Sequence, residues 1–246
     1  FEVHLPSMLE PWFSVRDFGV GMSNDEIELI YNTYFESTKT ESNDYVGCLG
    51  LGSKSPFCYT DTFSVISIQD GVQNVYTAFL ENGVPKSAHM DTETTDAPNG
   101  MLVQFSVEQK DFDRFTIEAN SIYSRFIEKP LILNNSNFRF EEIEYQYEGT
   151  NWGIRDNSHS RDTYAIMGNI AYPINFHSLN IPYSHENYSL IRSIIACGID
   201  ITFGIGELEI TASRENLHFD DRTIRNIIKK FLQVHKELVS IIYKKF

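Results

Sequence analysis

The sequence predicts an α+β fold in two parts, each with strands and helices of its own. Short stretches of alternating apolar and polar residues, typical of half-buried strands, recur along the chain. Between them lie a few stretches whose apolar residues have helical spacing. The 246 residues are 41% hydrophobic, which is enough to bury a core in one large or two ordinary domains. Together these features indicate the α+β class.

The first expected domain spans residues 1–128 and opens with strands. The expected strands are 1–5, 12–17, 62–68, 72–80 and 100–107. The last three are separated by turns and a polar stretch at 89–99, which predicts an antiparallel meander. A helix is expected from Ser23 to about Phe35, with Ser23 and Glu26 forming a capping box.

The middle of this domain contains a long glycine-rich stretch. Residues 36–55 are polar and then rich in glycine, which predicts a mobile functional loop. It runs into a short helix at 55–59, with Pro56 in the first turn. A helix over 109–127 closes the domain, because Lys129-Pro130 ends it.

The second expected domain spans residues 129–246 and ends in a long amphipathic helix. Its strands are expected at 137–145, 163–174 and 198–210. The helix is expected from about Asp221. Its apolar stripe is Ile224, Ile227, Ile228, Phe231, Leu232, Leu238, Val239 and Ile242.

Composition excludes several classes of function. Lys and Arg number 20 against 34 Asp and Glu, a net charge of -14, which argues against a broad nucleic-acid interface. The sequence has no uninterrupted run of about 18 apolar residues, so no transmembrane helix is expected, and the first residues do not resemble a signal peptide. Cys48, Cys58 and Cys197 are scattered and the histidines form no ligand pair, so neither a zinc site nor another transition-metal site is expected.

The first motif is "DFGVGM", Asp17 to Met22, between a strand and a helix. A carboxylate at a strand end can accept a hydrogen bond from an amino group, and Gly19 and Gly21 let a flat ring approach the backbone. An adenine amine fits this description, and a tight turn without a ligand is the alternative. The kinase magnesium loop is excluded because no H-R-D loop or strand lysine lies upstream.

Two further motifs suggest phosphate binding. Gly47, Gly50 and Gly52 precede Ser53 and Lys54, a pattern close to a phosphate loop but without its G-K-[ST] ending. Backbone N–H groups before a helix still attract an anion, and Lys39 and Lys54 add positive charge. Arg214 lies on a loop between a strand and the long helix. Taken alone, the glycine cluster also fits a flexible loop without a ligand, and Arg214 also fits a surface ion-pair partner.

In this order the three motifs resemble the GHKL ATPase superfamily, which includes gyrase, the ninety-kilodalton heat-shock chaperone, histidine kinases and MutL. Its members share the Bergerat nucleotide-binding fold, a sandwich of mixed sheet and helices followed here by a smaller α+β transducer-type domain. The segments "VRDFGVGMS", "ESNDYVGCLGLGSKSPFCYTDTF" and "SREN" followed by "DDRT" resemble more closely the phage rIIA family, the protectors from prophage-induced early lysis. This resemblance extends from about residue 1 to 230.

The superfamily resemblance implies ATP with Mg²⁺ as the ligand. Asp17 would bind the adenine amine, and Gly19, Gly21 and Met22 would line the base. The phosphates would be held by Lys39, Gly47, Gly50, Leu51, Gly52, Ser53 and Lys54. Arg214 would reach the γ-phosphate from the second domain and sense its presence.

Two departures from the superfamily pattern limit the expected activity. The E-x-x-x-N helix, which carries the general base and the Mg²⁺ ligand, is expected to lie before residue 1 in a longer polypeptide, so no catalytic or metal-binding residue is assigned. Met101 stands where the superfamily has the threonine of a "GT" pair, and a lost hydrogen bond of this kind costs about 0.5–1.5 kcal/mol. The chain is therefore expected to bind ATP and to hydrolyse it very poorly.

The rIIA resemblance implies a role in lysis control, exclusion or anti-defence in the infected host. The expected location is the host cytoplasm or the periphery of the inner membrane. Expected partners are an rIIB-like phage protein or a host factor, with a homodimer as a further option. The alternative is a degenerate GHKL scaffold that acts as a protein-interaction module without ATP turnover. A histidine kinase and a type II topoisomerase are less favoured.

Overall fold

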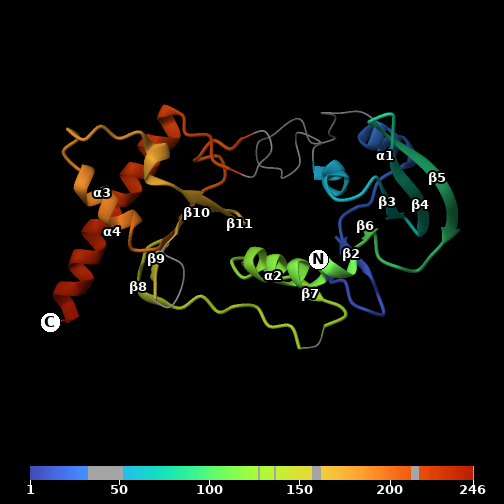
Figure 1. The fold of residues 1–246 in the computed structure, drawn as a ribbon, viewed down its shortest axis with the longest axis horizontal. Helices are drawn as coiled ribbons and strands as arrows, with labels where there is room; N and C mark the ends of the chain where they lie inside the picture. Colours follow the sequence, from blue (N-terminus) through green and yellow to red (C-terminus); the bar gives the residue numbers. More distant parts are fainter. Residues whose placement is uncertain (33–51, 127, 136, 157–161, 212–215, 246) are drawn as a thin grey trace. The chain divides into compact units, whose positions relative to one another are not determined.

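The computed structural model describes residues 1–32, 52–126, 128–135, 137–156, 162–211 and 216–245 (Figure 1). The chain divides into two compact units. The first unit comprises residues 1–123 and 128–140, and the second comprises residues 124–127 and 141–246. Each unit has its own sheet and its own buried core.

The described strands of the first unit form a seven-stranded sheet in the order β5-β4-β3-β6-β2-β1-β7. All neighbouring strands are antiparallel except β1 and β7. The strands are β1 (Glu2–His4), β2 (Trp12–Arg16), β3 (Thr62–Gln69), β4 (Val72–Glu81), β5 (Val84–Thr94), β6 (Gly100–Ser106) and β7 (Leu131–Ile132).

One face of this sheet is apolar and is covered by helices. Side chains alternate between the two faces of a strand, and the register places Phe13 and Val15 of β2 opposite Phe105 and Val103 of β6. Val65 of β3 continues the row. The covering elements are α1 (Asn24–Asn32), the 3-10 helix η1 (Gly52–Cys58), the short η2 (Gln109–Asp111) and α2 (Phe112–Tyr123).

Two apolar clusters lie between these helices and the sheet. The first joins α1 and η1 to β3, β4 and β6, and it includes Ile27, Tyr31 and Phe63. The second joins α2 to β1 and β2, with Ala119 packed near Val3. The first unit is therefore a sheet with one buried, helix-covered face.

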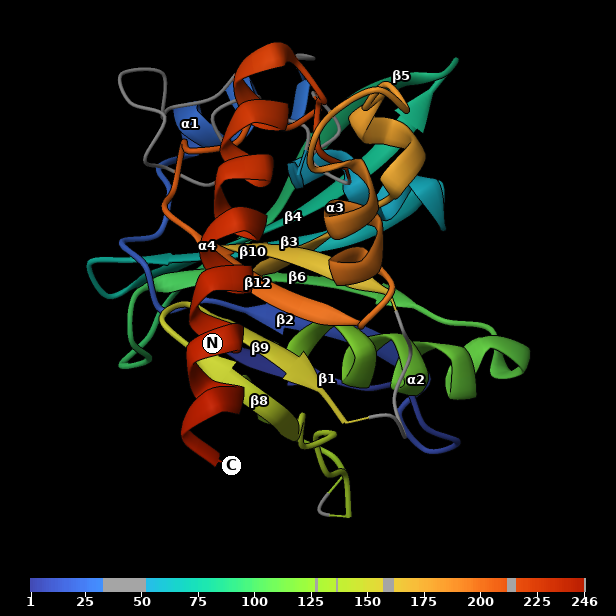
Figure 2. The same cartoon turned by 90° about the vertical axis from the view of Figure 1, so that its left-hand side faces the viewer.

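The second unit is a five-stranded mixed sheet with helices packed on it (Figure 2). Its strand order is β11-β10-β12-β9-β8, and only β10 and β12 run parallel. The strands are β8 (Tyr145–Gly149), β9 (Trp152–Arg155), β10 (Thr163–Met167), β11 (Ile170–Ile174) and β12 (Ile199–Phe203). The helices are η3 (Phe176–Leu179), α3 (Tyr188–Ile195) and α4 (Asp221–Lys245). The buried residues Ile191 of α3 and Phe231 of α4 belong to one core with Ile201 of β12.

Several local predictions are confirmed. Ser23 and Glu26 form the capping box, because the Glu26 carboxylate accepts the Ser23 N–H at 2.8 Å and the Ser23 hydroxyl accepts the Glu26 N–H at 3.4 Å. The long helix begins at Asp221 as predicted, and the Asp220 carboxylate before it accepts the Thr223 N–H at 2.8 Å.

Other local predictions are wrong. The strand predicted over 137–145 begins only at Tyr145, while Phe138 instead packs against the second cluster of the first unit. The polar stretch 89–99 contains the end of β5, an edge strand whose side chains are mostly exposed. On α4 the predicted stripe included Val239 and Ile242, which are exposed, whereas Val234 is buried. The helix predicted over 109–127 is η2 followed by α2, and α2 ends at Tyr123.

Candidate functional site

Asp17 lies where β2 ends and faces the helix-covered side of the sheet. Arg16 is the last residue of β2 and pairs with Leu102 of β6. The Asp17 N–H then donates to the Met101 carbonyl at 2.9 Å, which extends the pairing by one residue. Because side chains alternate, Asp17 points to the same face as Val15, toward the layer that holds α1.

The same row continues across the sheet to Ser67 of β3, which pairs with Met101. Ser67 is completely buried. Its hydroxyl accepts the Met22 N–H at 2.8 Å and donates to the Met22 carbonyl at 2.7 Å. We call Asp17, Met101 and Ser67 the Asp17 row. Ser67 therefore fixes the end of the Asp17–Met22 turn onto the sheet.

The Asp17 carboxylate is held by one oxygen and open at the other. Its Oδ1 accepts the Gly19 N–H at 2.9 Å and the Met101 N–H at 3.1 Å. Among the residues that the structure describes, no donor bonds to Oδ2, and Asp17 is exposed. A carboxylate oxygen is an acceptor only. The turn thus presents a fixed, open acceptor to any amino group that enters this layer.

The turn itself accounts for the glycine at position 21. Gly21 has φ +76°, and a Cβ there would lie 2.2 Å from the Ile68 carbonyl oxygen. The left-handed conformation and the close backbone approach both require glycine. On the neighbouring strand, Gly100 has φ +149°, and a Cβ there would lie 2.2 Å from the Asp17 carbonyl oxygen. Gly19 is different, because an added Cβ would meet only the Asp17 carboxylate, at 3.1 Å.

Lys54 of η1 is buried against α1. Its ammonium donates to the carbonyl of Ile30 in α1 and to the Ser53 hydroxyl at 3.3 Å. Only 6% of the residue is exposed, and burial lowers the pKa of its ammonium. A helix end leaves carbonyls without intrahelical partners. In this arrangement Lys54 therefore ties η1 to the carboxyl-terminal turn of α1.

The rest of the predicted phosphate-binding set lies outside the described residues. This applies to Lys39, Gly47, Gly50 and Leu51, whereas Gly52 and Ser53 begin η1.

Arg214 also lies outside the described residues. The segments on either side of it are close together, because Ile210 bridges to Leu217 and the Thr211 N–H donates to the Asn216 carbonyl at 2.9 Å.

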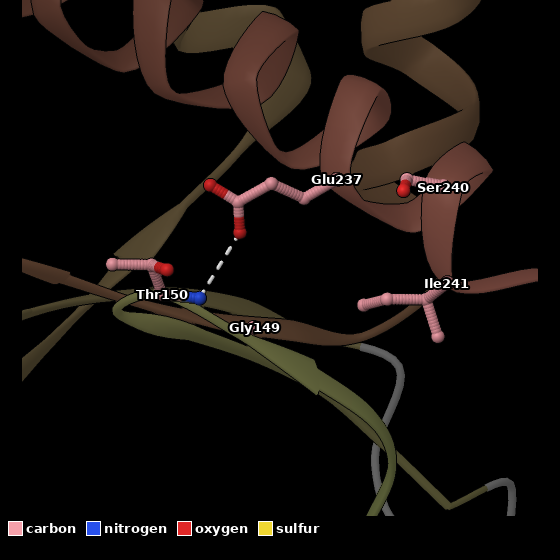
Figure 3. A pocket seen from close by; sticks show the side chains of 5 residues that line it. All are labelled: Gly149, Thr150, Glu237, Ser240 and Ile241. Atoms are coloured by element: carbon pink, nitrogen blue, oxygen red, sulfur yellow. Dashed lines mark hydrogen bonds between the residues drawn. The ribbon is translucent and has the colours of Figure 1, made fainter. Parts of the chain in front are cut away.

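A hollow in the second unit lies between the β8–β9 turn and α4 (Figure 3). Gly149, Thr150, Glu237, Ser240 and Ile241 line it. The Glu237 carboxylate accepts the Thr150 N–H at 3.0 Å, the Trp152 indole N–H at 2.7 Å and the Gln233 amide at 2.8 Å. These bonds, that of Gln233 first, lower the pKa of Glu237. Because protein donors occupy both carboxylate oxygens, we assign this hollow a structural role.

A second hollow lies beside α3, and its walls are mostly aromatic and aliphatic. Phe176, His177, Tyr188, Arg192, Ile195 and Ala196 line it. Neither of these two hollows contains a residue of the first unit, so neither coincides with the Asp17 row.

The second unit also buries a charged group. Asp200 accepts hydrogen bonds from Arg155 at 2.5 Å and from the Tyr145 hydroxyl at 3.0 Å, and Arg125 lies 3.9 Å away. Burial raises the pKa of Asp200, and the two guanidinium groups oppose that rise. Arg125 and Arg155 both lie over the Tyr164 ring. Buried charges are found with partners of this kind because a buried charge without one is costly.

In the part of the chain that the structure describes, no group of three or more His, Cys, Asp or Glu side chains is placed to hold a metal ion. Within those same residues, none of the helices combines the length and apolarity needed to cross a lipid bilayer.

Comparison with known proteins identifies the fold. No protein-family model matches the chain, and no curated protein matches it in sequence. Among solved structures, it resembles the ATPase region of Saccharomyces cerevisiae topoisomerase II, with TM-score 0.51 and 14% identity over 97% of this chain and 79% of that chain. A structure of the same region bound to ICRF-187 (dexrazoxane) has TM-score 0.56 and 14% identity, and the match covers 96% of this chain and 79% of that chain. The chain therefore has the mixed α+β fold of that ATPase region.

Proposed function

We propose that the first unit binds ATP, with Asp17 accepting a hydrogen bond from the adenine amine. The observation that carries this proposal is the state of the Asp17 carboxylate. Two backbone N–H groups fix Oδ1, and Oδ2 has no partner among the described residues. The fold of a GHKL ATPase region supports a nucleotide as the ligand.

The residues around Asp17 fit a flat base with one amino group. Met22 and Met101 contribute apolar, polarisable side chains to the cluster beneath the turn. Gly19 keeps the surface next to the carboxylate free of a side chain. Gly21 passes over the sheet backbone at Ile68, which holds the turn in place. An amino group entering here would meet an acceptor that needs no rearrangement.

The phosphates would lie toward η1. The residues proposed to hold them are Gly52, Ser53 and Lys54, together with Lys39, Gly47, Gly50 and Leu51. Lys54 can reach a phosphate only by leaving the Ile30 carbonyl. Bound Mg²⁺ would neutralise the phosphate charge. The proposal concerns binding of the nucleotide and not its hydrolysis.

We further propose that ATP closes residues 36–55 over the phosphates and draws Arg214 of the second unit toward the γ-phosphate. Closure of loops and domains around a ligand is a common way to transmit its presence. In this proposal residues 1–128 are the ATP-binding domain and residues 129–246 are the transducer.

The biological role we propose is that of an rIIA-like phage protein in lysis control, exclusion or anti-defence. It rests on the resemblance of the sequence motifs around Asp17, Gly52 and Arg214 alone. An rIIB-like protein or a host factor would be the partner, with homodimerisation and peripheral association at the host inner membrane as further parts of the proposal.

A second candidate is a GHKL scaffold that docks a protein partner without using a nucleotide. Two observations favour it. Met101 offers the row no polar side-chain atom, and Lys54 is already bonded to Ile30. Phage-infection assays separate the two candidates, because a pure scaffold keeps its biological effect when Asp17 is replaced by Asn.

Calorimetric titration of ATP·Mg²⁺ tests the binding proposal. Asp17→Asn keeps an oxygen for the two backbone N–H groups but places an NH₂ donor opposite the adenine amine. An unsatisfied donor costs about 1–3 kcal/mol, so affinity should fall about tenfold to a hundredfold. Asp113→Asn, at an exposed position of α2, removes the same charge and should leave affinity unchanged. Equal affinity of Asp17→Asn and wild type would rule out the adenine assignment.

A further inference from the structure

Tyr31 of α1 is a buried tyrosine in the layer that the Asp17 row faces. Only 4% of the residue is exposed, and its ring centroid lies 6.0 Å from that of Phe63. It belongs to the same apolar cluster as Met22, which ends the Asp17–Met22 turn, and Met101, whose N–H bonds to the Asp17 carboxylate. Tyr31 therefore shares its surroundings with the proposed adenine site.

The hydroxyl of Tyr31 has no hydrogen-bond partner among the described residues, unlike the hydroxyls of Tyr76, which is buried in the same cluster, and of Tyr145, which is exposed. The Tyr76 hydroxyl donates to Asn24 at 3.1 Å and the Tyr145 hydroxyl donates to Asp200 at 3.0 Å. The Tyr31 oxygen is also not among the fully enclosed atoms that lack a partner. The oxygen therefore reaches accessible space, and in this largely apolar layer a donor that can be reached points to a ligand or an ordered water as its partner.

The Asp17 carboxylate acts on the Tyr31 hydroxyl through its negative charge. Burial raises the pKa of Tyr31, and the Asp17 charge adds to the rise. The geometry agrees, because Asp17 and Met101 continue the inward-facing register of β2 and β6, and Tyr31 lies on the face of α1 that packs against them. Ser67, another hydroxyl of this layer, exchanges two hydrogen bonds with the Met22 backbone.

We propose that the Tyr31 hydroxyl donates a hydrogen bond to a ring nitrogen of the bound adenine, directly or through one water. This inference rests on the proposed binding of ATP by the first unit. Asp17 can only accept and a protonated hydroxyl can donate. The edge of adenine presents an amine donor beside a ring-nitrogen acceptor, which is the complement of that pair. Guanine presents a carbonyl in place of the amine, and at position 1 a protonated ring nitrogen in place of the acceptor. Asp17 would therefore reject guanine in either case, and Tyr31 would add to the selection of adenine if it contacts position 1.

Tyr31→Phe isolates the hydroxyl, because the ring stays and the hydroxyl has no protein partner to lose. We expect its ATP affinity to fall about three- to tenfold, the effect of one neutral hydrogen bond, with thermal stability unchanged in the absence of ligand. Tyr76→Phe is the matched control, since it lies in the same cluster but its hydroxyl bonds to Asn24. It should lower stability and leave the ratio of ATP to GTP affinity unchanged.

Titrations with 1-deaza-ATP and 7-deaza-ATP identify the contact through a double-mutant cycle. The analogue that lacks the contacted nitrogen should bind wild type and Tyr31→Phe equally, while ATP should distinguish them. Equal ATP affinity of wild type and Tyr31→Phe, with Asp17→Asn still weakened, would overturn the role of Tyr31 and leave the proposed function standing. Absence of ATP binding by wild type would overturn both.

Discussion

Replacement of Gly21 by alanine tests whether the Asp17–Met22 turn is built as described. Gly21 has φ +76°, and its Cβ would lie 2.2 Å from the Ile68 carbonyl oxygen. The left-handed backbone costs an L-residue about 1–2 kcal/mol. The clash forces the turn to move, which threatens the Met22–Ser67 hydrogen bonds, worth about 1 kcal/mol each. We therefore expect Gly21→Ala to lower the free energy of unfolding by about 3–4 kcal/mol in total.

Gly83→Ala is the matched control for backbone strain. Gly83 has φ +78°, nearly the same as Gly21, but nothing lies within 4 Å of its Cβ position. It should cost about 1–2 kcal/mol. Urea unfolding followed by Trp12 fluorescence reports on the first unit when Trp152 of the second unit is replaced by Phe. Equal destabilisation by the two alanines would refute the close packing of the turn on β3.

Two pH dependences follow from pKa shifts. Burial lowers the pKa of Lys54. Its contribution to stability is therefore present above the usual lysine pKa of about 10.4 and is lost as the pH falls through the lowered pKa. Lys54→Met should flatten this part of the plot of unfolding free energy against pH, as measured with urea, and an unchanged plot would contradict the burial of the ammonium. Glu237 has a pKa lowered by its hydrogen bonds, so its contribution is present above about 4.3 and is lost at more acid pH. Glu237→Gln should remove this loss of stability at acid pH, as measured by unfolding of the second unit between pH 3 and 6. A variant as sensitive to acid as wild type would refute the stabilising role of the Glu237 hydrogen bonds.

The position of Asp17 could be predicted from the sequence because it depends on local signals. A strand pattern ends at Arg16, two glycines follow, and a capping box starts the next helix at Ser23. Each of these signals lies within a few residues of the motif. The resemblance then suggested a ligand for it. The structure adds that Gly21 is required by the turn's own packing, whereas Gly19 borders the open carboxylate.

Ser67 and Tyr31 could not be found in this way because their importance depends on register between distant strands. Ser67 meets Met22 only because β3 pairs with β6 and β6 with β2, and these strands are not consecutive. Alternation in "TFSVISI" does place Ser67 on the face of Phe63 and Val65, which is the one local signal available. Tyr31 likewise reads as one apolar residue in a helical stripe.

The missed elements have similarly physical causes. β5 is an edge strand with mostly exposed side chains, so it lacks the alternation that identifies a half-buried strand. β9 has only four residues, all buried, and α3 has only eight. Residues 137–145 alternate as a strand would, but Phe138 packs instead on the second cluster of the first unit.

The central claim is that an adenine nucleotide binds at the Asp17 row, and amide chemical shifts test it most directly. Two-dimensional ¹H–¹⁵N spectra of the deuterated protein, recorded during addition of ATP·Mg²⁺, would locate the ligand. The account predicts that the largest shifts arise at the amides of Gly19, Met22 and Met101, and that Asp17→Asn reduces them. Shifts confined to the hollows beside Glu237 or Arg192 in the second unit would contradict it.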